Sequence, residues 1–133
     1  RLDWSLTPET QALIVALGGN DMLRGLPPTE ARKNLGAILA GAKAKGLPSL
    51  LVGLAAPSNY GPAYQSDFNA VYTDLAAEYG ADLMPNYFAA LGVGPDLAAL
   101  MQADGIHPNA AGVAKIVESI GPYVIDIAAK AAP

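Results

Sequence analysis

Short continuous apolar runs alternate along this chain with longer segments of helical periodicity. The runs at 13–17 and 49–56 each stop at turn-forming residues, which is typical of strands that are buried on both faces of a parallel sheet. A weaker run at 81–85 predicts a third strand. Because the first run is as apolar as a central strand, we expect another strand to pair with its free edge.

The segments between these runs have the length of crossover helices. The first is expected from about Thr29, a plausible N-cap, to Gly46, and the second spans roughly 63–79 and ends at Gly80. Residues 86–101 contain "LGVGPD" and are expected to form a loop-rich connection with short helical pieces. The aromatic residues of the second helix are interpreted as core or sheet cover.

A last helix is expected after Asn109, with Val113, Ile116 and Ile120 on one face. Gly121-Pro122 should break or kink it before the apolar pattern resumes. Strands that alternate with helices predict an α/β fold with right-handed crossovers, and 133 residues without a linker or repeat indicate a single domain. Ligands of such sheets bind beyond the carboxyl ends of the strands.

Composition narrows the class of protein. Hydrophobic residues make up 52% of the chain and charged residues 15%, so a well-buried interior is expected. The net charge of −4 and the lack of a basic patch argue against a nucleic-acid partner. The absence of cysteine excludes disulfides and thiolate chemistry. No apolar run reaches the ~20 residues that a membrane-spanning helix needs.

The one histidine, His107, is the first candidate for chemistry. It lies in "DGIHPN" (104–109), where Asp104 precedes it by three residues and Gly105 permits a tight turn. A carboxylate at this spacing can orient an imidazole that acts as a general base. Alternatively, Asp104 only caps the following helix, although Asn109 could take that role.

The second candidate is "GGND" (18–21), directly after the first strand. Two glycines permit close approach of a substrate, and the amide of Asn20 is suited to donate a hydrogen bond to a developing oxyanion. Asp21 is interpreted as structural, bonding the turn. The competing interpretation is an ordinary turn rich in Gly, Asn and Asp that ends the strand.

Together, "GGND" and "DGIHPN" resemble two sequence blocks of the SGNH (GDSL-type) hydrolases, and the chain is most similar to the bacterial arylesterase and thioesterase I/lysophospholipase branch. "NDMLRGLPP" (20–28) and "APSNYGPAY" (56–64) also have counterparts there. The resemblance implies a flavodoxin-like, three-layer α/β fold with a parallel sheet. It implies His107 as general base, Asp104 as its partner and Asn20 as oxyanion donor.

The resemblance also implies a binding pocket for a small aryl or acyl ester. The loops 22–26 and 57–60 would flank the acyl or leaving-group pocket, while the two glycines let the substrate approach; alternatively, the apolar residues of these loops only cover the core. The expected substrate-binding residues are Gly18, Gly19, Met22, Leu23, Pro57, Ser58, Asn59 and Tyr60. The reaction would be hydrolysis of a carboxylic ester or thioester through an acyl-serine intermediate, with no cofactor or metal.

The chain departs from the family at the nucleophile, because it contains no "GDS" block. None of its serines follows a strand in a Gly-Asp context; they are Ser5, Ser49, Ser58, Ser66 and Ser119. Two strand–helix units of ~30 residues each would supply both the serine and the partner of the first strand. We therefore expect residues 1–133 to be the C-terminal part of one SGNH-hydrolase domain, with the first strands and the serine on a separate N-terminal segment.

Two rival hypotheses remain at this point. The chain could be a non-catalytic α/β binding or assembly module in which both blocks serve only as turns. It could also hold a metal ion between Asp104, His107 and Asp21, although one histidine and two aspartates are few ligands for a metal site. The resemblance further suggests a periplasmic or secreted location, because members of this branch are often exported.

Overall fold

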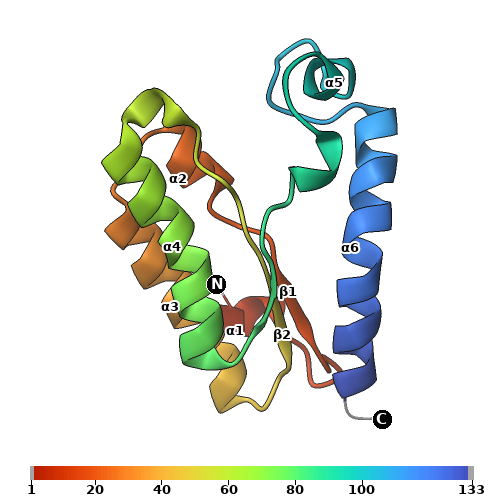
Figure 1. Cartoon of the computed structure of the whole chain (residues 1–133). Helices are drawn as coiled ribbons and strands as arrows, with labels where there is room; N and C mark the ends of the chain where they lie inside the picture. Colours follow the sequence, from red (N-terminus) through yellow and green to blue (C-terminus); the bar gives the residue numbers. More distant parts are fainter. Residues whose placement is uncertain (1, 132–133) are drawn as a thin grey trace.

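Three parallel strands form the middle layer of the structure, a computed structural model that describes residues 2–131 (Figure 1). They lie in the order β1 (Leu13–Val15), β2 (Ser49–Val52), β3 (Asp82–Met84). The register pairs Leu13 with Ser49 and Leu50 with Asp82. All three strands therefore end on the same edge of the sheet.

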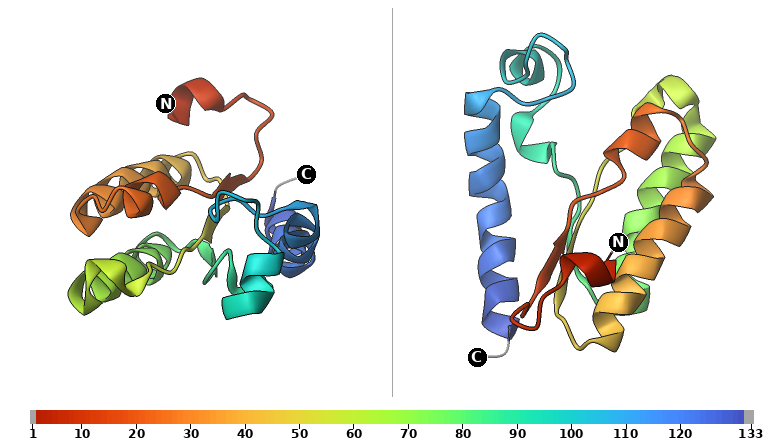
Figure 2. Two further views of the ribbon diagram at one scale, coloured as in Figure 1. Left: turned by 90° about the horizontal axis from the view of Figure 1, so that it is seen from above. Right: turned by 180° about the vertical axis from the view of Figure 1, so that it is seen from behind.

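Helices cover both faces of this sheet, as the two further views in Figure 2 show. Helices α3 and α4 lie on one face and α6 lies on the other (Figures 1 and 2). The helical elements are α1 (Leu2–Ser5), α2 (Gly19–Leu23), α3 (Pro28–Ala44), α4 (Pro62–Tyr79), α5 (Gly94–Ala99) and α6 (Ala110–Lys130), with short 3-10 helices η1 (Ser58–Tyr60) and η2 (Ala89–Leu91). The predicted three-layer α/β architecture is confirmed.

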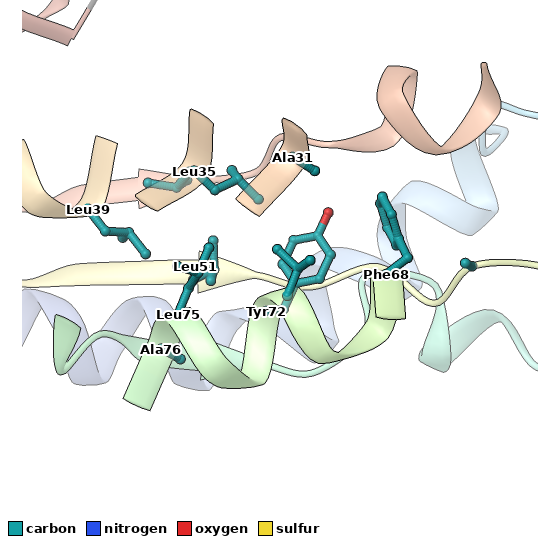
Figure 3. Packing of buried hydrophobic residues seen from close by; sticks show 11 residues of the cluster. Ala31, Leu35, Leu39, Leu51, Phe68, Tyr72, Leu75 and Ala76 are labelled. Atoms are coloured by element: carbon teal, nitrogen blue, oxygen red, sulfur yellow. The ribbon is translucent and has the colours of Figure 1, made fainter. Parts of the chain in front are cut away.

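The core consists of two clusters separated by the sheet. Leu51 of β2 faces the α3/α4 side, where it packs with Leu35, Tyr72 and Leu75 (Figure 3). Its neighbours Leu50 and Val52 pack instead with Met84 and Ile127 on the α6 side. Because alternate residues of β2 meet different helical layers, all four of its residues are buried, and three in succession, Leu50, Leu51 and Val52, are apolar.

Strand β1 differs from its predicted character. The sequence indicates a strand 13–17 buried on both faces, but the strand covers only 13–15, and the side chain of Ile14 is 45% exposed. Within residues 2–131, β1 pairs with β2 alone and forms an edge of the sheet. The register pairs Ile14 with Leu50, whose side chain packs on the α6 side, but Ile14 at the edge of the sheet belongs to neither buried cluster and stays exposed. Pairing of its other edge with a further strand stays a prediction.

The helix ends follow backbone preferences that the sequence only partly reveals. Thr29 is not the N-cap of α3: Pro27 takes that position and Pro28 begins the helix. Proline fits the first helical position because its fixed φ is helical and its missing N–H needs no partner there. Gly46 and Gly80 have φ values of 67° and 69°, which confirms that both helices end at these glycines.

The predicted break of the last helix is wrong. Helix α6 runs without interruption from Ala110 to Lys130, with Pro122 inside it (Figure 1). A proline inside a helix removes one backbone hydrogen bond and costs about 3 kcal/mol. Ile120, Tyr123 and Ile127 on both sides of the proline pack against the sheet, and this burial holds the helix together across it.

Candidate active site

The sequence-predicted site residues lie on segments at one end of the molecule, beyond the carboxyl ends of the strands (Figure 1). Helix α2 follows β1, η1 follows β2, and the loop 100–109 leads into α6. The α2 and η1 segments lie on the α3/α4 side of the sheet, whereas α5 and the loop lie on the α6 side. This is the edge at which parallel α/β sheets bind ligands.

Asp104 and His107 form the contact that their spacing suggested. The Asp104 Oδ2 atom lies 2.7 Å from His107 Nδ1, and Asp104 Oδ1 accepts hydrogen bonds from the backbone N–H groups of Ile106 (2.9 Å) and His107 (3.0 Å). Gly105, with a φ of 66°, makes the tight turn that allows this arrangement. Both oxygens of one carboxylate therefore hold the turn and the imidazole together.

These hydrogen bonds set the charge of the carboxyl group. Donation from the His107 ring is the main cause, followed by the two backbone N–H groups, and together they hold the pKa of Asp104 well below its usual range. An ionised carboxylate can only accept hydrogen bonds, so the proton of a neutral His107 resides on Nδ1. Nε2 is then left as the acceptor, on a side chain that is 69% exposed.

A small antiparallel ladder supports the loop that carries this pair. Met101 and Pro108 form an isolated bridge, and Gln102 N donates to His107 O at 2.7 Å. Asn109 adds both a backbone bond to Leu100 O (2.9 Å) and a side-chain cap, because its Oδ1 accepts from Gly112 N at 3.0 Å. Asn109, rather than Asp104, is thus the N-cap of α6, and Asp104 is free to bind His107.

"GGND" forms the start of a helix and not only a turn. Gly18 has a φ of 106°, which turns the chain out of β1, and its carbonyl accepts from Met22 N at 3.0 Å to begin α2. Asn20 is the second residue of this helix, and its exposed side chain makes no hydrogen bond within residues 2–131. Its amide is therefore available to an external acceptor.

Asp21 was expected to be structural and to bond the turn, and within residues 2–131 it does so through its backbone only. Its carboxylate forms no hydrogen bond there, whereas its backbone carbonyl accepts from Leu26 N at 3.0 Å. The carboxylate instead lies in the first turn of α2, where negative charge is favoured by the helix dipole. The proposed metal ligands are likewise not assembled, since no group of three or more metal-binding side chains gathers within residues 2–131.

The two predicted substrate-binding loops are joined by Tyr60. Its hydroxyl donates to Leu23 O at 2.9 Å, so the loop after β2 touches the end of α2. Leu23 and Tyr60 are 48% and 41% exposed, and they leave apolar surface at this end of the sheet. The neighbouring residues Pro57, Ser58 and Asn59 are also exposed.

Two residues of α4 that no sequence pattern singled out, Gln65 and Asn69, also hold the loop after β2. Asn69 Oδ1 accepts from Ala56 N, and Gln65 Nε2 donates to Ala56 O, each at 2.8 Å. Gln65 and Asn69 are four residues apart and so share one face of the helix. Polar residues at these two positions, flanking the buried Phe68 in the sequence, are the signal that could have identified them.

Not every pair of predicted residues is in contact. No hydrogen bond joins Asn20 or any described serine to His107 within residues 2–131. Ser58 lies in η1, on the α3/α4 side, and Ser49 is buried at the start of β2, where its hydroxyl donates to Leu47 O. The described residues thus place the Asp104–His107 pair and the Asn20 amide on separate segments.

Comparison with known proteins identifies the family. Residues 1–115 match the model of the GDSL-like lipase/acylhydrolase family. The chain is 40% identical over 123 residues to esterase TesA of Pseudomonas aeruginosa, which covers 92% of this chain and 60% of TesA. It is 40% identical over 97 residues to thioesterase 1/protease 1/lysophospholipase L1 of Escherichia coli K12, which covers 73% of this chain and 45% of that protein.

The structural comparison agrees. A crystal structure of TesA superimposes with a TM-score of 0.83 at 36% identity, covering 96% of this chain and 69% of the other. The chain spans only about half of the length of the curated relatives that it matches. The family model, these relatives and the parallel α/β fold agree with the resemblance noted from the two sequence blocks: the chain belongs to the GDSL-like lipase/acylhydrolase family, the SGNH hydrolases.

Proposed function

We propose that residues 1–133 are the C-terminal part of one SGNH-hydrolase domain that hydrolyses carboxylic esters or thioesters. His107 is the general base, Asp104 its orienting partner and Asn20 a donor to the oxyanion. The nucleophilic serine belongs to an N-terminal segment of the same protein, which is the partner of this chain. The observation that carries the proposal is the Asp104–His107 pair, whose Nε2 is exposed beyond the carboxyl ends of the strands.

The Asp104–His107 geometry supports the following first half-reaction. His107 Nε2 accepts the proton of the serine hydroxyl as the oxygen attacks the substrate carbonyl, and Asp104 stabilises the imidazolium that forms. The Asn20 amide donates to the oxyanion of the tetrahedral intermediate. His107 then protonates the departing alkoxide or thiolate, which leaves an acyl-serine.

Water completes the cycle. His107 removes a proton from a water molecule that attacks the acyl-serine, and the carboxylic acid leaves as the serine recovers its proton from His107. No step requires a metal or an organic cofactor. The exposed apolar side chains of Leu23 and Tyr60 favour a small aryl or acyl ester over a polyanionic substrate.

The edge of β1 supports the partner proposed here. Ile14 is 45% exposed on a strand whose second edge is unpaired within the described residues, and Leu17 just beyond it is 54% exposed. An N-terminal segment that adds a strand at this edge would cover apolar surface and bring its strand end to the same side of the sheet as Asn20 and His107.

Denaturing intact-mass spectrometry before and after treatment with a fluorophosphonate tests the function. We expect the phosphonyl mass on the serine-bearing N-terminal segment, together with hydrolysis of p-nitrophenyl esters. Absence of both labelling and hydrolysis when that segment is present would contradict the proposal and favour a binding or assembly module. Labelling of one of the serines of residues 1–133 would contradict the proposed division of the site.

An exported location belongs to the same proposal. Within residues 2–131, no helix is long and apolar enough to cross a membrane. We infer a periplasmic or secreted protein from the family that it belongs to. Cell fractionation with an antibody to this chain tests the location, and recovery in the cytoplasmic fraction alone would contradict it.

A further inference from the structure

Helix α2 carries Asn20 but has little that holds it in place. It has five residues, none of them fully buried, and the Asn20 side chain has no hydrogen-bond partner within residues 2–131. A helix of this length is not stable on its own. The position of the Asn20 amide therefore depends on contacts that anchor the backbone at the two ends of α2.

A buried tyrosine supplies the anchor at the first end. Tyr72 of α4 is 1% exposed, and its hydroxyl donates to Leu17 O at 3.0 Å. Figure 3 shows this hydroxyl directed away from α4, on the side where α3 and the chain after β1 lie. Burial raises the pKa of Tyr72 above its usual value, with a smaller contribution from the charge of Asp21, so the group stays a donor.

The backbone at Gly18 passes very close to the Tyr72 hydroxyl. A Cβ atom on Gly18 would lie 2.2 Å from the Tyr72 oxygen, so the chain passes the hydroxyl at a distance that only glycine allows. Leu17 and Gly18 directly precede α2, and the Gly18 carbonyl makes the first hydrogen bond of the helix, with Met22 N. Fixing Leu17 therefore fixes the start of α2 at Gly19, one residue before Asn20.

The second anchor belongs to the same row of rings. Tyr60, Tyr64, Phe68 and Tyr72 pack in sequence, with ring centroids 5.1, 5.8 and 5.7 Å apart. Tyr60, at the outer end, donates to Leu23 O, and Tyr72, at the inner end, donates to Leu17 O. The row thus holds α2 at both ends, three residues before and three residues after Asn20, and the Tyr72 contact is the more deeply buried of the two.

We propose that Tyr72 is a positioning residue for Asn20: its buried hydroxyl, bound to Leu17 O, aims the amide of Asn20 at the oxyanion. This inference rests on the proposed function of Asn20. Tyr72 itself touches neither the substrate nor the reacting atoms. It acts through the backbone of residues 17–20.

The test is Tyr72→Phe, with Tyr64→Phe as the matched control. Both variants remove one buried hydroxyl from the same row and keep the ring, but the Tyr64 hydroxyl has no hydrogen-bond partner among residues 2–131. The variants are made in the protein that includes the serine-bearing segment. For Tyr72→Phe we expect kcat to fall at least about fivefold, short of the ~100-fold expected for Asn20→Ala, with KM within about twofold.

Two further measurements separate positioning from loss of stability. Amide hydrogen exchange of residues 19–22 should accelerate in Tyr72→Phe at a temperature where the variant remains folded, and should not change in Tyr64→Phe. In an Asn20→Ala background, Tyr72→Phe should lower kcat no further, because the group that it positions is gone. A purely structural role for Tyr72 would lower kcat equally in both backgrounds.

The outcomes distinguish this inference from the proposed function. If Asn20→Ala lowers kcat and Tyr72→Phe does not differ from Tyr64→Phe, Tyr72 has no positioning role and the proposed function stands. If Asn20→Ala leaves kcat unchanged, the proposed oxyanion donor is wrong, and the positioning inference falls with it. A fall in kcat for Tyr72→Phe that disappears in the Asn20→Ala background supports both.

Discussion

Asp104 binds His107 through two different hydrogen bonds. The imidazole Nδ1 lies 2.7 Å from Oδ2, and the backbone N–H of the same histidine donates to Oδ1 at 3.0 Å. One carboxylate thereby sets both where His107 lies in the turn and which ring nitrogen carries the proton. The pair is exposed to solvent, so it orients the imidazole but adds little to the folding stability of the protein.

Replacing Asp104 by Asn should abolish most of the activity. The neutral amide no longer stabilises the imidazolium, and when its NH₂ faces the ring it selects the tautomer with the proton on Nε2. We expect kcat to fall by about 10³–10⁴-fold, as for the corresponding change in a Ser-His-Asp triad. The kcat of the wild type and the variant is measured by steady-state hydrolysis of a p-nitrophenyl ester, with the serine-bearing segment present in both proteins.

Asp96→Asn is the control for that change. Asp96 lies in α5, at the same end of the sheet, and is exposed, so this variant removes the same charge without affecting the His107 ring. Its kcat should remain within about twofold of the wild type. An equal loss in both variants would show that net charge, and not the hydrogen bond to His107, matters.

The Asp104 carboxyl group should titrate far below an ordinary aspartate, whose pKa is about 3.9. Because its folded-state pKa is lowered, the stabilisation by ionised Asp104 is present above the unfolded-state value and is lost as the pH falls through the lowered value. NMR of the ¹³Cγ resonance against pH measures the midpoint. In His107→Ala the midpoint should rise toward the ordinary value, and an unchanged midpoint would argue against the ring hydrogen bond as the main cause.

Gly112→Ala should destabilise the loop that carries the pair. A Cβ at Gly112 would lie 2.3 Å from the Leu100 carbonyl oxygen, so the loop or the start of α6 must shift. Overpacking of this kind costs about 1–3 kcal/mol, which urea unfolding measures. In the same helix, the new Cβ of Gly121→Ala meets no described residue within 4 Å, and the change should stabilise by about 0.5–1 kcal/mol. Equal effects of the two variants would rule out the close contact at Leu100.

Gly18→Ala should be more destabilising than Gly46→Ala. Both glycines have positive φ values, 106° and 67°, but no atom of residues 2–131 lies within 4 Å of a Cβ on Gly46, whereas a Cβ on Gly18 meets the Tyr72 hydroxyl. Backbone strain alone costs about 1–2 kcal/mol, and the clash at Gly18 adds to it. Thermal unfolding of Gly18→Ala with and without Tyr72→Phe should reveal partial rescue, and the absence of rescue would exclude the clash.

The amino-acid sequence by itself determined the features that depend on neighbouring residues. Continuous apolar runs predicted three parallel strands, and Gly46 and Gly80 marked the ends of two helices, because a left-handed residue ends a helix wherever it occurs. The contact between Asp104 and His107 was also predictable. It spans three residues, and the tight turn at Gly105 is enough to form it.

Only the tertiary structure decided features that join distant segments. The Tyr72 hydroxyl meets Leu17, 55 positions away, and Pro122 stays inside α6 because residues on both sides of it pack on the sheet. Likewise, "GGND" begins a helix because the backbone at Gly18 turns around a side chain from α4. Such contacts depend on how the layers pack, and local preference cannot predict them, since burial can outweigh a propensity of a few kcal/mol.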